Sequence, residues 1–246
     1  MLKAPDRFPD DTLRRTAIAR GTFAPEVNAA IFDKWFRPPP SHFLRYALRK
    51  YRLDQRAVVD VGSAYGHALR RFGPGSYGVE MNPAAAEWSN AIGLPTLCGD
   101  MEQIEVPKVS AAWCRDVLEH ADSPHLILRR LWGVLEDDGL TFLALPLTNA
   151  GRHLARFSSK FRGYAAADHV NFFTAPTLRL TIERAGFEIV ELTMGFGPVV
   201  DRLFLGLAPA CLVVARKIPG WEYAPKSTRC TVKGRKDRPL HEIGLP

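Results

Sequence analysis

The chain has 246 residues, of which 46% are hydrophobic and 24% charged, enough apolar material for one sizeable core. Its longest apolar stretch, 203–215, is shorter than the roughly 20 apolar residues that a membrane-spanning helix needs. The first eleven residues hold no apolar run, so we predict no signal peptide. The four cysteines form no Cys-x-x-Cys pair, which argues against a zinc ribbon and fits a reducing, cytoplasmic location.

Positive charge is concentrated near the C-terminus. The formal net charge is +7, and residues 217–246 contain seven Lys or Arg against three Asp or Glu, a local balance of 7 − 3 = +4. We interpret 217–246 as a basic, solvated tail, because like charges at chain ends are usually solvated. The sequence lacks the interleaved aromatic and basic residues of an RNA-binding module, so a nucleic-acid partner is not expected.

Residues 1–56 read as a helical extension. A first helix is predicted from Asp11 or Thr12 to about residue 20, and a second over 25–36, before the prolines at 38–40 stop it. Ser41 is a good N-cap for a third helix that runs to about residue 53.

From residue 57 onward, strand and helix patterns alternate. Strands are predicted at 57–61, 76–80, 96–98, 111–115 and 140–145, with intervening helices at 65–72, 83–92 and 124–135. Asn82-Pro83 and Ser123-Pro124 supply the caps of the second and third of these helices. This alternation predicts βαβ units and a parallel sheet covered by helices on both faces.

The alternation breaks at 147–175, which we interpret as an insert within the domain 57–216. A helix over 176–185 and strands at 187–192 and 211–216 follow. Within the insert, basic residues at roughly helical spacing favour a solvated surface helix, with a lid or a peripheral membrane contact as alternatives. These residues are Arg152, Arg156, Lys160 and Arg162.

The first predicted strand ends in a sequence suited to a ligand loop. Gly62 and Gly66 permit a tight turn and a close approach of ligand to backbone. Glu80 follows Asp60 by twenty residues, at the end of the second strand, where a carboxylate can bind ribose hydroxyls. A dinucleotide loop would have glycine where this chain has Ala64 and His67, so a pyrophosphate is disfavoured.

S-adenosylmethionine (SAM) fits this loop better, because it carries no phosphate and its sulfonium and ammonium groups suit carboxylates such as Asp60. After the third strand, Asp100 is placed to accept from an adenine amine and Met101 to pack on the ring. Asp116 follows the fourth strand, at the mouth of the cleft.

At these motifs the chain resembles the class I SAM-dependent methyltransferases of the small-molecule branch. The matching stretches are VVDVGSAYG, GVEMNP, GDMEQI, CRDVLEHADSP and DHVNFFTAPTLRLTIERAGFEIVEL, which span roughly residues 57–216. The resemblance implies a Rossmann-like α/β fold with seven strands, mostly parallel with the last antiparallel, in addition to the N-terminal helices. It further implies that residues 1–56 cover the acceptor site and that the insert 147–175 lies on the acceptor side.

The resemblance also assigns cofactor residues. The loop from Asp60 to Gly66 would hold the methionine end of SAM, Glu80 the ribose, and Asp100 with Met101 the adenine. One departure is Ala64, where the family usually has glycine; a positive φ there would cost about 1 kcal/mol of affinity. The full expected set is Asp60, Gly62, Ser63, Ala64, Gly66, Glu80, Met81, Asp100, Met101, Asp116 and Val117.

For catalysis we predict methyl transfer to a hydroxyl oxygen of a small-molecule, lipid or glycan acceptor. An imidazole suits removal of the hydroxyl proton near neutral pH, and His120 and His169 are the candidates. No metal is expected, although Asp116, Glu119 and His120 resemble a cluster that holds a divalent ion in quinone O-methyltransferases. Two other functions stay open: a non-catalytic SAM-fold binding protein, and a nicotinamide-dependent oxidoreductase.

Overall fold

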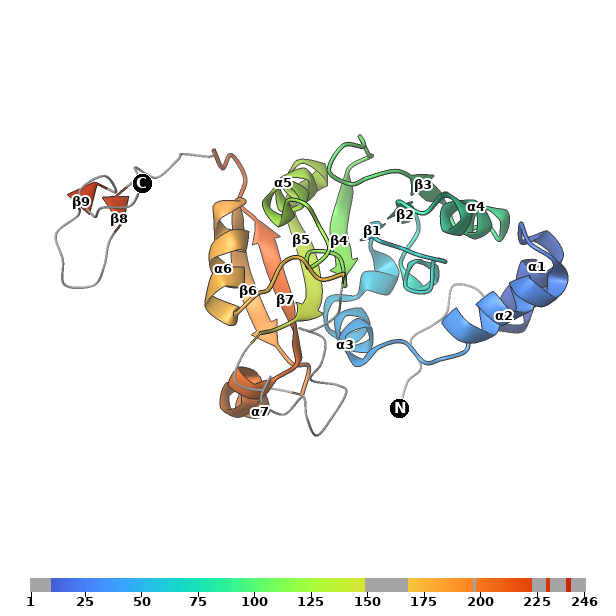
Figure 1. Ribbon diagram of the computed structural model, residues 1–246, viewed down its shortest axis with the longest axis horizontal. Helices are drawn as coiled ribbons and strands as arrows, with labels where there is room; N and C mark the ends of the chain where they lie inside the picture. The colour runs from blue at the N-terminus through green and yellow to red at the C-terminus, as the bar shows by residue number, and fades with distance from the viewer. Residues whose placement is uncertain (1–9, 149–167, 197, 223–228, 231–237, 240–246) are drawn as a thin grey trace.

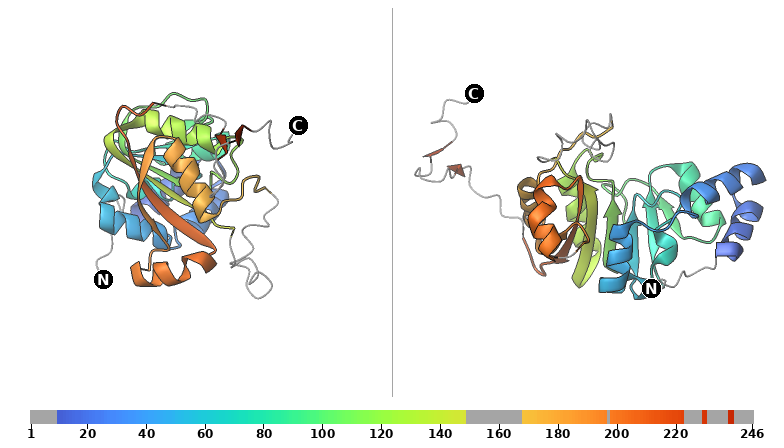
Figure 2. Two further views of the ribbon diagram at one scale, coloured as in Figure 1. Left: turned by 90° about the vertical axis from the view of Figure 1, so that its left-hand side faces the viewer. Right: turned by 90° about the horizontal axis from the view of Figure 1, so that it is seen from below.

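The computed structural model describes residues 10–148, 168–196, 198–222, 229–230 and 238–239. Most of the predicted insert and most of the basic tail, including Arg152, Arg156, Lys160 and Arg162, lie outside this set. In the described part, a single large sheet has helices on both sides (Figures 1 and 2).

The sheet has seven strands in the order β3-β2-β1-β4-β5-β7-β6. All neighbouring pairs are parallel except those made by β7, which is antiparallel to both β5 and β6. The strands are β1 (Val58–Val61), β2 (Tyr77–Glu80), β3 (Thr96–Cys98), β4 (Val109–Arg115), β5 (Leu135–Pro146), β6 (Phe187–Thr193) and β7 (Ala210–Lys217). This arrangement confirms the predicted seven-stranded fold with an antiparallel last strand.

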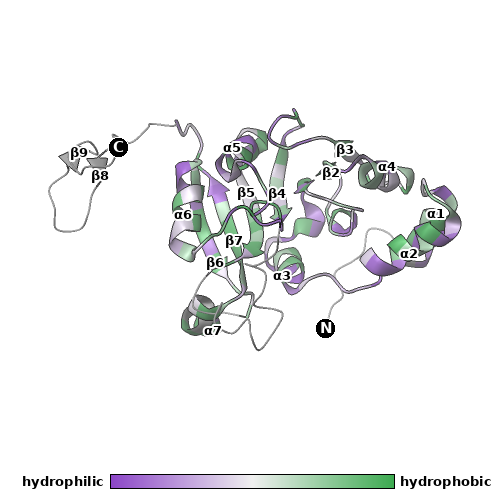
Figure 3. Cartoon of the chain, viewed as in Figure 1, coloured by the Kyte–Doolittle hydropathy of each residue, from purple (hydrophilic) through white to green (hydrophobic). Residues whose placement is uncertain are grey.

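Seven α-helices are described, and residues 229–230 and 238–239 pair as the short strands β8 (Arg229–Cys230) and β9 (Arg238–Pro239). The helices are α1 (Asp10–Arg20), α2 (Pro25–Trp35), α3 (His42–Tyr51), α4 (Pro83–Ala91), α5 (Pro124–Val134), α6 (Ala175–Arg184) and α7 (Pro198–Phe204). Hydrophobic and hydrophilic residues alternate along α1, α2 and α6, as in helices that bury one side (Figure 3). No described helix is both long and apolar enough to cross a bilayer.

Two hydrophobic cores lie on opposite faces of the sheet, because successive strand residues point to opposite sides. In β1, Val59 belongs to the core that α5 and α6 cover, whereas Val58 belongs to the core that α3 covers. In β4, Cys114 belongs to the core under α5 and α6, and Trp113 belongs to the core under α3. The prediction that both faces are covered is therefore confirmed.

The N-terminal helices α1 and α2 lie beside α4 (Figure 1). Asn28 of α2 is buried and accepts a hydrogen bond from Trp88 Nε1 of α4 at 3.0 Å. The Phe36 ring lies 5.6 Å from the Trp88 ring, and the Trp35 ring lies 5.7 Å from that of Tyr65. The extension thus packs on the segment that follows β1, which places it next to the predicted cofactor loop.

One predicted helix is wrong. Residues 65–72 form turns and a short 3-10 helix, Leu69–Arg71, instead of an α-helix. The physical cause is the backbone just before and at the start of this segment, where Gly62, Ala64 and Gly66 have φ values of +67°, +47° and +80°. A right-handed helix needs negative φ, so it cannot pass through these positions.

Candidate functional site

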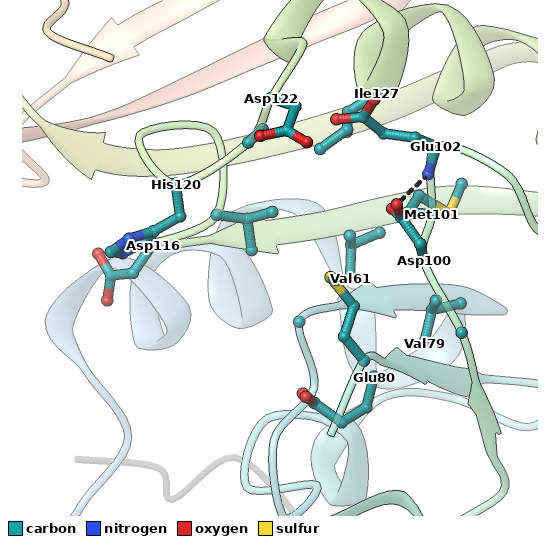
Figure 4. A pocket seen from close by; sticks show the side chains of 15 residues that line it. Val61, Val79, Glu80, Asp100, Met101, Glu102, Asp116, His120, Asp122 and Ile127 are labelled. Atoms are coloured by element: carbon teal, nitrogen blue, oxygen red, sulfur yellow. Dashed lines mark hydrogen bonds between the residues drawn. The ribbon is translucent and has the colours of Figure 1, made fainter. Parts of the chain in front are cut away.

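A cavity of about 260 Å³ opens at the carboxyl ends of β1, β2 and β4, where ligands bind in open α/β sheets (Figure 4). In Figure 4, Asp116 and His120 lie on the left of the cavity, and Asp100 and Met101 lie on the right. Glu80 lies at the bottom of the view. The lining residues are Val61, Gly62, Val79, Glu80, Met81, Gly99, Asp100, Met101, Glu102, Asp116, Val117, His120, Ala121, Asp122 and Ile127.

The loop after β1 depends on its glycine at the cavity wall. Gly62 has a φ of +67°, and a Cβ added to it would lie 2.6 Å from Cγ2 of Val117. Both conditions require glycine, since any side chain would clash and would also strain the backbone. Ala64 adopts a φ of +47° without this freedom, so the loop carries the strain foreseen at this position.

Glu80, at the end of β2, is fixed by two backbone donors. Its Oε2 accepts from the N–H of Ala64 at 2.7 Å, and its Oε1 accepts from the N–H of Asn82 at 2.8 Å. Each carboxylate oxygen keeps a further lone pair, so the group can still accept from hydroxyls in the cavity. The same carboxylate thus joins the loop after β1 to the cap of α4.

Asp100 and Met101 follow β3 and line the opposite wall. Asp100 Oδ1 accepts from the backbone N–H of Glu102 at 2.9 Å, the dashed bond in Figure 4. Asp100 therefore caps a turn and presents its remaining lone pairs to the cavity. Met101 is buried and offers an apolar surface of the kind that an adenine ring would cover.

Four predicted cofactor residues lie behind the cavity wall, outside its lining: Asp60, Ser63, Ala64 and Gly66. Burial raises the pKa of Asp60 to about 8, and the charge of Glu80 acts in the same direction while a backbone hydrogen bond from Leu69 opposes it. Asp60 is buried at the end of β1, and its carboxylate lies outside the cavity lining.

The turn after β4 forms the other side of the cavity. Asp116 has a φ of +53°, and its Oδ2 lies 3.0 Å from Nε of Arg115. Val117 and His120 line the cavity from the same turn. His120 Nδ1 lies 2.9 Å from the carbonyl oxygen of Asp168, to which it must donate. This hydrogen bond leaves Nε2 of the neutral ring with its lone pair.

The segment 168–173 is held against this turn by backbone and amide hydrogen bonds. The N–H groups of Val170 and Asn171 both donate to the carbonyl oxygen of Glu119, each at 2.9 Å. As a result the ring of His169 lies 4.7 Å from the ring of His120, at nearly a right angle. The structure therefore brings both predicted catalytic histidines together, although only His120 lines the cavity.

Glu119 lies beside the two imidazoles and is only 1% exposed. Burial raises its pKa to about 7. Sequence reasoning gave it only a place in an alternative metal cluster, and it did not single out Glu102, Asp122 or Ile127 of the cavity lining. Glu102, in the loop after β3, accepts a hydrogen bond from the N–H of Ser123 at the cap of α5, at 3.1 Å. This tertiary contact, which the sequence pattern does not reveal, joins the two segments at the cavity.

A family described as a methyltransferase domain matches residues 32–192. No curated protein shows significant sequence similarity to the chain. Solved structures share the fold, but their sequence identity to this chain is below 20%, so the similarity supports the fold alone.

Three of these structures illustrate the range. A complex of the Haloferax volcanii Trm112 methyltransferase activator with a proposed methyltransferase gives a TM-score of 0.56 at 18% identity, covering 86% of this chain and 99% of that one. Magnesium protoporphyrin IX methyltransferase from Synechocystis, with bound SAH, gives a TM-score of 0.52 at 13% identity, covering 71% of this chain and 80% of that one. The [4+2]-cyclase SpnF gives a TM-score of 0.53 at 17% identity, covering 72% of this chain and 80% of that one.

The sheet order, the cavity at its carboxyl edge and the carboxylate after β2 define a Rossmann-like SAM-dependent methyltransferase. The chain belongs to the methyltransferase domain family, whose match spans residues 32–192. Its cofactor is SAM, and its substrate is a methyl acceptor.

Proposed function

We propose that the enzyme transfers the methyl group of SAM to a hydroxyl oxygen of a small-molecule, lipid or glycan acceptor. The observation that carries this proposal is the division of the cavity. Glu80, Asp100 and Met101 occupy the side formed by β2 and β3, and His120 occupies the side formed by β4.

In this arrangement Glu80 binds the ribose hydroxyls, and Asp100 with Met101 binds the adenine. Met81, Asp116 and Val117 complete the lining around the donor, while Asp60, Ser63, Ala64 and Gly66 hold the loop that the methionine end of SAM contacts. The acceptor would then be held on the side of His120, in line with the methyl group of the donor.

The reaction is a single displacement. A lone pair of the acceptor oxygen attacks the methyl carbon, the carbon–sulfur bond breaks with its electrons going to sulfur, and S-adenosylhomocysteine leaves. The hydroxyl proton goes to an imidazole nitrogen. His120 suits this step, because donation from its Nδ1 to Asp168 leaves Nε2 able to accept a proton. His169, 4.7 Å away between ring centroids, acts as base or acceptor contact.

The test is a methyl-transfer assay with SAM and a panel of phenols, lipid alcohols, glycans and amines, read by mass spectrometry. Oxygen methylation of at least one hydroxyl acceptor, lost in the double variant H120A/H169A, is the expected result. Methylation of amines or thiols alone, with every hydroxyl acceptor unmodified, would show that the acceptor atom is not oxygen.

A further inference from the structure

Glu119 is a buried carboxylate with an unused oxygen. The residue is 1% exposed, and its Oε2 has no hydrogen-bond partner within the part of the chain that the structure describes. Buried polar groups are almost always paired, because an unpaired one costs about 1–3 kcal/mol. Glu119 Oε2 is therefore a buried acceptor that is available to a ligand.

Two imidazoles stand beside this carboxylate. One ligand atom from each of Glu119, His120 and His169 lies within 4.8 Å of the other two. Around a tetrahedral zinc ion at about 2.0–2.2 Å, ligand atoms lie about 3.3–3.6 Å apart. Side-chain rotations that move these atoms by about 1 Å would therefore close the three groups around one cation.

The backbone around these three residues is fixed in advance. Besides the two bonds that the N–H groups of Val170 and Asn171 donate to the Glu119 carbonyl, the side chain of Asn171 donates from Nδ2 to the carbonyl oxygens of Leu118, at 3.2 Å, and Ala121, at 2.6 Å. Four hydrogen bonds thus hold the segment with His169 to the turn with Glu119.

The orientation of His120 also suits a ligand. Its Nδ1 donates to the carbonyl oxygen of Asp168 at 2.9 Å, and the Asp168 carboxylate lies 3.5 Å away. Histidines that bind metals typically donate their second ring N–H to a carbonyl or carboxylate, which fixes the tautomer and orients the other nitrogen.

We propose that Glu119, His120 and His169 form a binding site for a divalent transition-metal cation, with Zn²⁺ as the best match. Imidazole favours zinc and related ions over magnesium and calcium, which prefer all-oxygen sites. Three protein ligands leave one coordination position open. His120 lines the cofactor cavity, so the proposed site borders that cavity.

This ligand set differs from the one that the sequence suggested, because it uses His169 in place of Asp116. Asp116 is engaged by the guanidinium of Arg115, with 3.0 Å between Oδ2 and Nε. A cation at the proposed site would supply Lewis-acid assistance to an acceptor oxygen. A bound cation would occupy the imidazole nitrogens to which the proposed function assigns the hydroxyl proton, so in the metal-loaded enzyme the cation would take over activation of the acceptor oxygen. Metal binding is measured without an acceptor, so its failure is distinguishable from a failure of the proposed function.

The test is a titration of the full-length, chelator-treated protein with Co²⁺, followed by competition with Zn²⁺ and Mg²⁺. We expect one equivalent of Co²⁺ to produce the visible absorption of a four- or five-coordinate site, and Zn²⁺ but not Mg²⁺ to abolish it. His169→Ala and Glu119→Gln should each weaken Zn²⁺ binding at least tenfold. Asp116→Asn and His125→Ala serve as controls and should leave it unchanged.

Circular dichroism and cooperative urea unfolding verify that each variant is folded. Absence of a 1:1 signal in the wild-type protein would overturn the proposal without any variant being needed. An unchanged Zn²⁺ affinity in folded His169→Ala, or a loss in Asp116→Asn as large as in Glu119→Gln, would overturn the assignment of His169.

Discussion

The carboxylate of Glu80 accepts a hydrogen bond from the backbone N–H of Ala64, with 2.7 Å between Oε2 and N. A side chain at the end of β2 is thereby joined to the loop after β1, and its other oxygen is joined to the N–H of Asn82 at the cap of α4. The group expected to bind ribose is thus also a support of the loop next to it.

Replacement of Glu80 by alanine should weaken SAM binding by roughly 1–3 kcal/mol, because charged hydrogen bonds to the ribose are lost. Calorimetric titration with S-adenosylhomocysteine measures the change. Glu87→Ala, an exposed glutamate of the adjacent helix α4, is the matched control and should bind as the wild type does. Equal affinities for both variants would refute the role of Glu80.

Replacement of Ala64 by glycine should stabilise the protein by up to about 0.6 kcal/mol. The φ of +47° costs alanine about 1 kcal/mol, and the added freedom of the unfolded glycine chain offsets part of the gain. Chemical unfolding measures the difference. Ala91→Gly, at the end of α4, should shift stability in the opposite direction, because glycine destabilises a helix. Destabilisation by Ala64→Gly would contradict the strain argument.

Replacement of His169 by alanine should reduce turnover at least tenfold while leaving SAM affinity within about twofold, since general-base catalysis contributes about 10²–10⁴-fold and His169 lies outside the cofactor cavity. The assay is steady-state methyl transfer at saturating SAM, combined with binding of S-adenosylhomocysteine. His125→Ala, a histidine on helix α5, is the control and should keep both values. A parallel loss of turnover and of cofactor binding would indicate that His169 only supports the fold.

Acid should destabilise the protein through His67. Burial, with the charges of Arg71 and Arg70, lowers the pKa of His67 to about 4, below the value of about 6.5 in the unfolded chain. The unfolded state therefore binds a proton that the folded state resists, and stability falls as the pH drops from about 6.5 toward 4. We expect a loss of about 1–3 kcal/mol over this range.

The measurement is urea unfolding of wild type and His67→Gln at pH 7 and pH 5. Glutamine cannot take up the proton, so the gap in stability between the two proteins should narrow or reverse at pH 5. A gap that is the same at both pH values would show that His67 does not titrate in this way.

Much of the fold could be predicted from local sequence signals. Ser41, Asn82 and Ser123 each cap a helix as expected, because their side chains accept from backbone N–H groups of the first turn. The strands also appear where short apolar runs predict them. Such signals depend on a few neighbouring residues, so no knowledge of tertiary contacts is needed.

Other features could not be read in this way. The segment after β1 has a helical pattern of residues, but Ala64 has a positive φ and its N–H donates to Glu80, sixteen residues away in the sequence. Similarly, Cys98 falls in a predicted buried strand, yet it is exposed because β3 is the edge of the sheet. The contact of His169 with Glu119 and His120 depends on chain closure over about fifty residues.

A crystal structure with bound S-adenosylhomocysteine tests the account of the donor site most directly. We expect the ribose hydroxyls within hydrogen-bond distance of Glu80, the adenine between Asp100 and Met101, and the sulfur directed toward His120. Electron density for the ligand elsewhere, with this cavity empty in a folded protein, would contradict the account.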